Sequence, residues 1–496
     1  MLTTSIPRIV VSGLRGGGGK TVLALSLIAS FKEKGFDVTP FKKGPDYIDS
    51  GWLAKASGVP CYNLDLFMMT QEQVVNSFIN HTQNSELAII EGNRGLFDGV
   101  DHEGTFSTAA LAKLLSAPVI ITIDCTKATG TIAAMILGCQ KMDPDVSIGG
   151  VVLNRIATSR QESVIRKAIN NQCGIPVLGV IPKLSKDPFP ERHMGLTPYQ
   201  EHKGIEESLA VVAGFGEKYL DMDGILKVAK NAGELKTEVR SQKSEVRSQK
   251  TEHRLQKIEV SKKRGRTAGD ESRITNYELP ITNSPRIGII RDSAFQFYYQ
   301  DNLDELKKRG AELVEVSPLK ESRLPDIDAL YIGGGFPETH AISLAENKEF
   351  RNALHSAVQD GLPVYAECGG LMYLGKNIVL EDHTYPMVGA LPITFGLGKR
   401  PRAHGYTIVE VINANSYFPE KTVLKGHEFH YSHLLDIDRD AVKMVFDVKR
   451  GKGIVDNMDG LCYKNVLATY THLHAIGSPE WADGMVNAAI KFKNQK

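Results

Sequence analysis

Short apolar runs rich in β-branched residues recur along most of the chain, and helical spacing of apolar positions follows many of them. Such runs are typical of strands buried on both faces, as in parallel sheets that are covered by helices. The pattern therefore predicts an α/β protein of two doubly wound, mainly parallel-sheet α/β domains joined by a charged linker. The runs are RIVVSG, LAIIEG, PVIITID, IGGVVLN and PVLGVI in the first half, and RIGIIRD, AELVEVSP, ALYIGGG and LPVYAEC in the second.

A sevenfold repeat separates the two halves. TEVRSQK, SEVRSQK and TEHRLQK follow one another from Thr237. The only regular apolar position recurs once per seven residues, as Val239, Val246 and, after His253, Val260. A coiled-coil seam needs two such positions, so a solvated tether is the better interpretation, with a nucleic-acid-binding arm as the alternative. We predict one domain at 1–233, a low-complexity charged linker at 234–284 and a second domain at 285–496. The length of 496 residues agrees, because domains usually run to roughly 100–200 residues.

Charge and composition exclude several classes of function. Lys plus Arg (59) almost balance Asp plus Glu (58), so no overall field favours nucleic acid or an anionic membrane surface. The chain contains neither a run of about 18 apolar residues nor a signal-peptide pattern. Its six cysteines form no C-x-x-C pair, which argues against a zinc or disulfide framework. We expect a cytoplasmic protein with no nucleic-acid or membrane partner.

A glycine-rich loop joins the first strand to the first helical stretch, in the order Gly13-Leu-Arg-Gly-Gly-Gly-Gly-Lys20-Thr21. The amides of such a loop bind phosphate at a helix N-terminus, whereas the alternative is a simple flexible turn. The spacing fits the deviant form K-G-G-x-x-K-T, with Arg15 in place of the signature lysine. Lys20 is expected to reach the β- and γ-phosphates, and the Thr21 hydroxyl to hold Mg²⁺. The predicted ATP-binding residues here are Gly16, Gly17, Gly18, Gly19, Lys20 and Thr21.

Two further loops should converge on the same phosphate, because they follow strands of the same sheet. PFKKGPDYIDSGW carries Lys42 and Lys43, which can neutralise phosphate or a substrate carboxylate. The same loop carries Asp46, and EGNRGLFDG begins with Glu91; both are candidates for the Mg²⁺ shell. An isolated Asp in a Gly-Pro turn is equally typical of turn chemistry. The grouping of these loops favours the metal site.

In the second half, the strand LPVYA leads into Glu367-Cys-Gly-Gly and then a helical stretch. A nucleophile at such a turn is exposed above the sheet, and a helix N-terminus is expected to lower the pKa of the Cys368 thiol. On its own this cysteine is as typical of a small buried hydrophobe. The strand ALYI, however, ends in three glycines whose amides can form an oxyanion hole. The predicted oxyanion site consists of Gly334, Gly335 and Gly369.

Several stretches resemble the cobyrinate a,c-diamide synthase family, which joins a domain similar to dethiobiotin synthetase to a class I glutamine amidotransferase. In the first domain they are FKKGPDYID, NLDLFMM, EGNRGLFDG, GVVLNRI and ERHMGL. In the second they are RDSAFQFYYQDNL, GGGFPETHA, AECGGLMYL, KGHEFHYS and ATYTHLHA. The resemblance implies that Asn154 lies near the adenine and that Thr21, Asp46 and Glu91 surround Mg²⁺. Among six late histidines it implies His472 as the base for Cys368.

The sequence departs from the family pattern at three places. Ser50 and Leu53 replace a Pro and a His that usually continue the GPDYID motif. The base of the wider amidotransferase class is commonly followed two residues later by an orienting Glu, and His474 stands there in this chain. His427 and His430 are interpreted as structural residues or as residues that face the macrocycle.

By this resemblance we predict a carbon–nitrogen ligase that amidates the a and c acetates of cobyrinate through acyl phosphates. ATP with Mg²⁺, L-glutamine and cobyrinate or a related tetrapyrrole are the implied partners, and a homodimer is compatible with the sequence. The alternative substrates are sirohydrochlorin, its nickel derivative and hydrogenobyrinate. An alternative of another class is a ParA-like ATPase whose amidotransferase-like half is a non-catalytic binding module.

Overall fold

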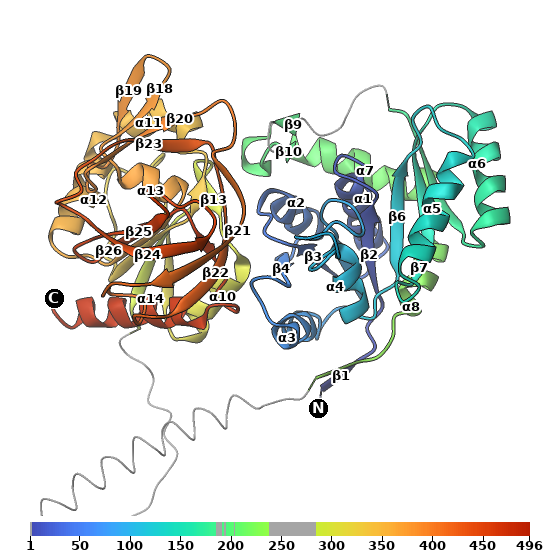
Figure 1. Cartoon of the computed structure of the whole chain (residues 1–496), viewed down its shortest axis with the longest axis horizontal. Helices are drawn as coiled ribbons and strands as arrows, with labels where there is room; N and C mark the ends of the chain where they lie inside the picture. The colour runs from blue at the N-terminus through green and yellow to red at the C-terminus, as the bar shows by residue number, and fades with distance from the viewer. Residues whose placement is uncertain (1, 185–190, 193–194, 203, 238–283) are drawn as a thin grey trace, which may run out of the picture.

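The computed structural model describes residues 2–184, 191–192, 195–202, 204–237 and 284–496 of the chain. Two α/β domains lie side by side, the first coloured blue to green and the second yellow to red (Figure 1). Most of the predicted tether, residues 238–283, lies outside the described residues. Its first part forms strand β11 (Leu235–Thr237), which pairs with β1 (Leu2–Thr4).

The first domain is built on a seven-stranded parallel sheet of Val-, Ile- and Leu-rich strands. In sheet order the strands are β4 (Tyr62–Leu64), β3 (Val38–Lys43), β5 (Leu87–Glu91), β2 (Arg8–Gly13), β6 (Val119–Asp124), β7 (Ile148–Ile156) and β8 (Val177–Pro182). Lys42 and Val11 both pair with Glu91 in register. The loops after β2, β3 and β5 therefore meet at the carboxyl edge, where α/β sheets bind ligands.

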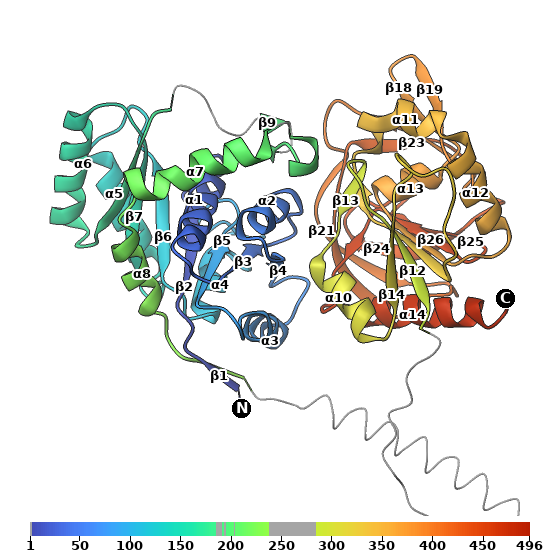
Figure 2. The same cartoon turned by 180° about the vertical axis from the view of Figure 1, so that it is seen from behind.

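Helices cover both faces of this sheet (Figures 1 and 2). One face packs against α1 (Lys20–Glu33), α2 (Ile48–Ser57), α7 (Ile205–Tyr219) and α8 (Met222–Lys230). The other packs against α3 (Gln71–His81), α4 (Thr108–Leu114), α5 (Thr131–Met142) and α6 (Ser159–Gln172). The short elements η1 (Tyr199–Glu201), β9 (Glu191–Arg192) and β10 (Gly195–Leu196) precede α7.

The second domain is built on a ten-stranded mixed sheet. Its parallel half, in sheet order, is β14 (Glu312–Val316), β12 (Arg286–Ile290), β15 (Ala329–Ile332), β17 (Val364–Glu367) and β26 (Val466–Thr469). An antiparallel half continues with β25 (Met458–Tyr463), β24 (Lys443–Arg450), β21 (Ala403–Val411), β22 (Val423–His430) and β27 (His472–Leu473). The predicted α/β class is confirmed, and the antiparallel half is an addition. Its strands alternate between buried and exposed residues, so they lack the continuous apolar runs that indicated the parallel strands.

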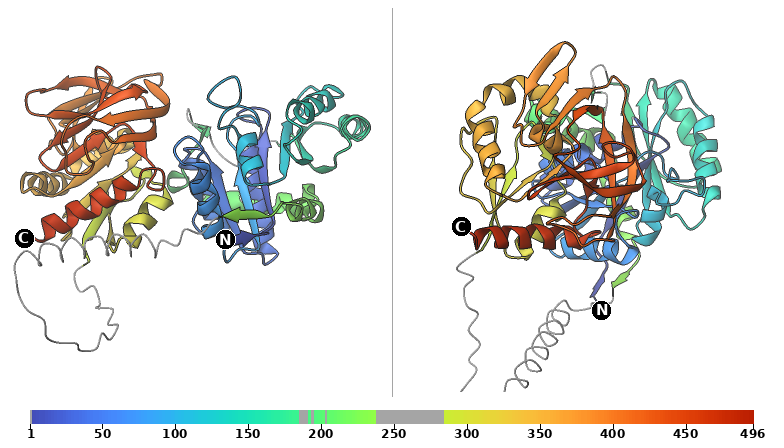
Figure 3. Two further views of the ribbon diagram at one scale, coloured as in Figure 1. Left: turned by 60° about the horizontal axis from the view of Figure 1, so that its bottom comes forward. Right: turned by 60° about the vertical axis from the view of Figure 1, so that its left-hand side comes forward.

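Helices and small sheets complete this domain. One face of the large sheet packs against α11 (Ala341–Glu346), α12 (Lys348–Gln359) and α13 (Gly369–Leu374), and the other against α10 (Gln300–Lys308) and α14 (Pro479–Lys493). The helix α14 runs along the underside of the domain (Figure 3). The remaining elements are β13 (Phe295–Phe297), β16 (Gly334–Gly335), η2 (Pro337–His340), β18 (Asn377–Leu380), β19 (His383–Pro386), β20 (Ile393–Leu397) and β23 (Ser432–Ile437). Among the described residues no helix has the length and apolar composition to cross a bilayer; the cytoplasmic location stays a prediction.

The domains meet where β4 and α2 of the first face α10 and β13 of the second (Figure 2). Phe67, Met68 and Tyr299 form a buried aromatic and thioether cluster at this contact. The Tyr406 hydroxyl donates a 2.7 Å hydrogen bond to Asp65 across it. The loop that follows β3 at the carboxyl edge of the first sheet thus faces β13 of the second domain.

Candidate active site

The glycine loop of the first domain is braced from the neighbouring strands. Gly17 and Gly19 have φ values of 68° and 91°, a left-handed conformation that favours glycine. The Gly18 carbonyl accepts hydrogen bonds of 3.3 Å from the Thr122 hydroxyl and from the Asn154 amide. A Cβ atom on Gly19 would lie only 2.3 Å from Asn154 Nδ2. Asn154 therefore fixes the loop as well as lying beside it.

The first two residues of α1, Lys20 and Thr21, connect the glycine loop to Glu91 at the end of β5. The Lys20 ammonium donates to the Arg15 carbonyl at 3.0 Å, and burial, followed by the charge of Lys42, lowers its pKa. The Thr21 hydroxyl donates a 2.7 Å hydrogen bond to Glu91, whose side chain is fully buried. The Arg15 side chain instead points to Asp124, at 3.2 Å, on the exposed side of the loop.

Lys42 is surrounded by carboxylates rather than left free for a substrate. Its ammonium lies 2.7 Å from Asp49, 3.1 Å from Glu91 and 3.8 Å from Asp46. Burial alone would lower the pKa of Lys42, but these three carboxylates raise it. Lys43 forms no ion pair within the described part of the chain, although the charge of Asp65 acts on it. The contact of Lys42 and Lys43 with phosphate or a substrate carboxylate stays a prediction. Sequence reasoning missed Asp49, whose only signal is its position three residues after Asp46.

The same carboxylates fit a magnesium ion bound together with phosphate. Glu91 Oε2 is buried and accepts no hydrogen bond from the described residues, while Oε1 takes the Thr21 hydroxyl. Burial raises the pKa of Glu91, and burial together with Asp49 raises that of Asp46 to about 7. No group of three or more His, Cys, Asp or Glu side chains in the described chain could hold a metal by itself. Mg²⁺ usually takes a few carboxylates and completes its shell with phosphate oxygens and water.

Cys368 lies at a strained turn between β17 and α13. Its φ of 48° and ψ of −99° place the residue outside the ordinary regions for a side chain larger than glycine. A Cβ atom on Gly369 would lie 3.0 Å from the Gly335 nitrogen, and one on Gly334 would lie 2.7 Å from His472 Cε1. The structure therefore brings together all five residues predicted for the glutaminase site: Cys368, His472, Gly334, Gly335 and Gly369.

His472 has an acidic partner that sequence reasoning missed. Its Nδ1 lies 3.2 Å from Glu367 Oε2, and Glu367 also accepts the Tyr331 hydroxyl at 3.1 Å and the Leu473 N–H at 3.2 Å. Glu367 directly precedes Cys368, so the orienting acid comes from the nucleophile's own strand. His474, at the position of the usual orienting Glu, instead lies 3.2 Å from Asp301.

The Cys368 thiol differs from the expectation in its acidity. Only 6 % of the residue is exposed, and burial, followed by the charge of Glu338, raises its pKa rather than lowering it. Loss of solvation outweighs the field of α13, which has only six residues. The thiol therefore depends on a base for its activation. The Nδ1 atom of His430 contacts the Ser432 carbonyl at 2.9 Å, and its ring is stacked on Tyr470.

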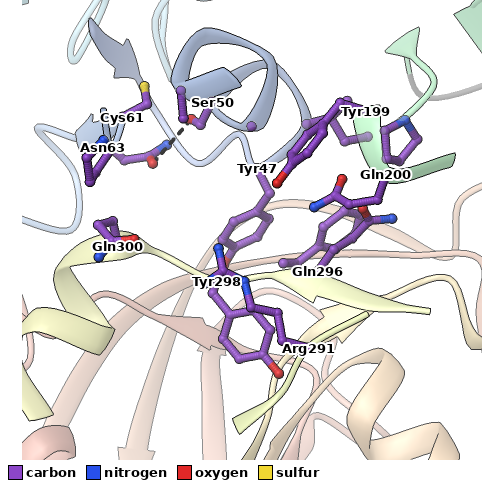
Figure 4. Close-up of a pocket in the computed structure, with 16 residues that line it drawn as sticks. Tyr47, Ser50, Cys61, Asn63, Tyr199, Gln200, Arg291, Gln296, Tyr298 and Gln300 are labelled. Carbon is purple, nitrogen blue, oxygen red and sulfur yellow. Dashed lines mark hydrogen bonds between the residues drawn. The ribbon is translucent and has the colours of Figure 1, made fainter. Parts of the chain in front are cut away.

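One cavity of about 560 Å³ extends between the two domains, and both Asp46 and His472 line it. Tyr47, next to Asp46, reaches into the second domain, where its ring is stacked on that of Phe297, with ring centres 5.2 Å apart and planes inclined by 8°. The centre of the Tyr47 ring lies 5.5 Å from that of the His472 ring. A smaller cavity of about 80 Å³ lies beside Tyr47 and is lined mainly by uncharged polar side chains of both domains (Figure 4). Asp46 of the first domain and His472 of the second thus border one interdomain space.

Two family models match the chain. Residues 9–196 match a CobQ/CobB/MinD/ParA nucleotide-binding domain, and residues 286–480 match a CobB/CobQ-like glutamine amidotransferase domain. A solved structure of chloroplast FtsY from Physcomitrella patens covers 45 % of this chain and 65 % of its own, with a TM-score of 0.28 and 15 % identity. That likeness is too weak to bear on the fold.

Relatives match over the full length and are named cobyrinate a,c-diamide synthase. The protein of Magnetococcus marinus is 38 % identical over 96 % of this chain and 96 % of its own length. That of Archaeoglobus fulgidus is 37 % identical over 99 % and 100 %, and that of Methanosarcina barkeri 36 % over 99 % and 98 %. The predicted resemblance and the enzyme class that it implied, a glutamine-dependent amidating ligase, are confirmed. The chain belongs to the cobyrinate a,c-diamide synthase family.

Proposed function

We propose that this protein converts the a and c acetate carboxylates of cobyrinate into carboxamides, using ATP and the amide nitrogen of glutamine. The main support is the interdomain cavity, whose lining includes both Asp46 and His472. A carboxylate is a poor electrophile, and ammonia is largely protonated at neutral pH. Activation of the acid and release of ammonia therefore have to occur close together.

The first domain would activate the acid. A carboxylate oxygen of the ring attacks the γ-phosphorus of ATP, and the bond from that phosphorus to the bridging oxygen breaks, giving an acyl phosphate and ADP. The amides of residues 16–19 and the Lys20 ammonium would bind the phosphates. Thr21, Glu91 and Asp46 would hold Mg²⁺, which neutralises charge on the phosphate oxygens.

Two further side chains have roles in this step. Lys43 would face the substrate carboxylate, because Lys42 is held by its three carboxylates. Asn154 would lie beside the adenine, as the family resemblance implies, and it already braces the glycine loop.

The second domain would supply the nitrogen. His472 takes the proton of the Cys368 thiol, and the thiolate attacks the side-chain carbonyl of glutamine. Amides of Gly335 and Gly369 are the candidates to stabilise the resulting oxyanion. His472 returns the proton to the leaving nitrogen, ammonia departs, and water hydrolyses the glutamyl thioester to glutamate.

Ammonia then attacks the acyl carbon, phosphate leaves, and the amide forms. The unprotonated amine is released inside the protein, so it meets the acyl phosphate before it equilibrates with water. This order of events accounts for the shared cavity.

The test is mass spectrometry of the ring after incubation with Mg-ATP and glutamine. Each amidation exchanges a hydroxyl for an amino group, so the mass identifies the ring and counts the events. Sirohydrochlorin, its nickel derivative and hydrogenobyrinate are included as competing substrates. Cys368→Ser should abolish glutamate release and glutamine-dependent synthesis but retain synthesis from ammonia. ATP turnover with neither glutaminase activity nor ring amidation would instead identify a binding module.

A further inference from the structure

The interdomain cavity is lined from both domains by three cations that lie outside ion-pair distance of any carboxylate in the described chain. Lys43 ends β3, Arg94 lies in the loop after β5, and Arg450 ends β24 of the second domain. None of the three forms an ion pair with any of the residues that the structure describes. In a chain with a formal net charge of +1, three unpaired cations around one cavity indicate that its ligand is anionic.

The three carboxylates on the cavity wall accept hydrogen bonds from backbone N–H groups. Asp46 accepts from Asp49 at 2.9 Å, and Asp98 accepts from Gly95 at 2.8 Å. Glu428 accepts from Lys452 at 2.6 Å and from Gly453 at 3.1 Å. The three acids are therefore held by the backbone, and none of them lies within ion-pair distance of Lys43, Arg94 or Arg450 in the described chain. The three cations remain available to an anionic group of a ligand.

Arg450 is held in place by a stack that crosses the domain boundary. Its guanidinium carbon lies 5.3 Å from the ring centre of Phe67 in the first domain. Phe67 in turn is stacked on Tyr406 of the second domain, with ring centres 4.3 Å apart and planes inclined by 18°. Phe67 and Tyr406 are therefore fixed together, and the position of Arg450 depends on correct docking of the two domains.

His404 adds a neutral polar group beside these cations. Burial, and after it the charge of Arg94, lowers the pKa of His404. Its ring lies 4.4 Å from that of Phe429, which also lines the cavity. The wall thus combines aromatic rings, two guanidinium groups and an imidazole, which suits a flat ring that carries several carboxylates.

We propose that Arg94 and Arg450 bind the non-reacting carboxylates of the tetrapyrrole, so that the glutaminase domain forms part of the substrate pocket of the synthetase. Arginine presents two parallel N–H groups that match a carboxylate. The cavity volume of about 560 Å³ lies within the usual range for small-molecule sites. This inference rests on the proposed function and extends it: a residue outside the ATP-binding domain selects the acid that is activated.

The experiment measures synthesis with ammonia as the nitrogen donor, which bypasses the glutaminase reaction. Arg450→Met is expected to raise the KM for cobyrinate about tenfold or more, the usual effect of losing a charge-assisted hydrogen bond. The KM for ATP and glutamine hydrolysis measured without the ring should stay at wild-type values. Arg450→Lys should recover part of the loss, because it keeps the charge but not the paired donors.

Arg94→Met tests the same pocket from the other domain, and its expected effect has the same direction. Arg439→Met is the matched control, since Arg439 is an exposed residue of the second domain that pairs with Asp456 at 2.7 Å. Thermal unfolding of each variant establishes that it is folded.

Two results would overturn the inference while leaving the proposed function intact. One is an unchanged KM for cobyrinate in both methionine variants of a protein whose wild type amidates the ring. The other is a rise in the KM for ATP alone, which would assign the two arginines to the nucleotide. A wild-type protein that neither binds nor amidates cobyrinate would remove the proposed function and this inference together.

Discussion

At the scale of single residues, Glu367 decides how well His472 works as a base. Its carboxylate lies within hydrogen-bond distance, 3.1 to 3.2 Å, of the His472 ring, the Tyr331 hydroxyl and the Leu473 N–H. Glu367→Gln removes the negative charge that holds the imidazole and stabilises its protonated form. We expect glutaminase kcat to fall about 10- to 100-fold, the effect of losing a charged hydrogen bond, with little change in the KM for glutamine.

The readouts for Glu367 separate orientation from folding. Glutamate release and ammonia-dependent synthesis are measured on the same preparation, because only the first reaction needs the His472 imidazole. Glu349→Gln, on the exposed face of α12, is the control. Wild-type kcat in Glu367→Gln would show that the acid has no part in the reaction. Equal loss of ammonia-dependent synthesis would instead indicate misfolding.

Asp46 is a carboxyl group whose ionisation falls close to neutral pH. Burial, followed by Asp49, raises the pKa of Asp46 from 3.8 to about 7. The folded state therefore binds more protons than the unfolded state between these values, and stability falls as the pH rises through this window. Asp46→Asn removes that dependence. We expect it to raise the melting temperature by a few degrees at pH 8 relative to wild type, with a smaller difference at pH 5.

Thermal unfolding over a series of pH values checks this expectation. Asp145→Asn, an exposed surface change, should leave the melting temperature close to that of the wild type throughout. A stabilisation by Asp46→Asn that grows as the pH falls would contradict the assigned direction of the shift.

At the scale of elements, the β17–α13 turn illustrates how close packing fixes the nucleophile. A Cβ atom on Gly370 would lie 2.5 Å from the Ile332 carbonyl oxygen, which belongs to β15 and cannot move freely. Gly370→Ala should therefore lower the free energy of unfolding by about 1–3 kcal/mol through overpacking. Gly138, in α5, has no atom within 4 Å of the same position. Gly138→Ala should raise stability by about 0.5–1 kcal/mol, because alanine loses less backbone entropy in a helix.

Chemical denaturation of both variants is the measurement, with glutaminase activity as a second readout for Gly370→Ala. Each of the two substitutions adds one methyl group to a helical glycine. Changes of opposite sign in the free energy of unfolding would therefore isolate the effect of packing against β15. A stabilised Gly370→Ala would mean that α13 lies farther from the sheet than the structure places it.

Elements also mark what sequence alone could and could not predict. The phosphate loop and the Cys368 turn were predictable, because strand, turn and helix are consecutive in the chain and carry local spacing. Glu367 was not assigned to His472, since the two are 105 residues apart and only the pairing of β17 with β26 brings the following loop back. The stretch NLDLFMM resembles the family, but its sequence alone gives no reason for that. In the structure its Phe67 and Met68 pack against Tyr299 at the contact between the domains.

At the scale of the whole molecule, the glutaminase loop is tied to the first domain by one buried carboxylate. Asp301 lies 3.2 Å from His474 and 3.2 Å from His81 of α3. Burial opposes ionisation of Asp301, but the two imidazoles outweigh it and lower its pKa to about 2. His474, two residues after His472, therefore serves domain docking where the wider class has an orienting acid.

Tyr47 also connects the two domains, and in the proposed function it lies between the two reactions. It follows Asp46 in the chain, and its ring packs on Phe297 and near His472. Tyr47→Ala would open this contact, so ammonia could escape to water before it reaches the acyl phosphate. We expect the ratio of glutamate released to amide formed to rise clearly above one, whereas Tyr47→Phe, which keeps the ring, should stay near the wild-type ratio.

The ratio is measured by quantifying glutamate and amidated ring in the same reaction, at saturating glutamine. Synthesis from added ammonia serves as the reference for each variant, because it reports the synthetase step without any transfer between sites. A leak predicts that Tyr47→Ala loses efficiency with glutamine more than with ammonia. Equal losses with both donors would place Tyr47 in the binding of the ring, and an unchanged ratio would mean that ammonia travels by a path that this side chain does not border.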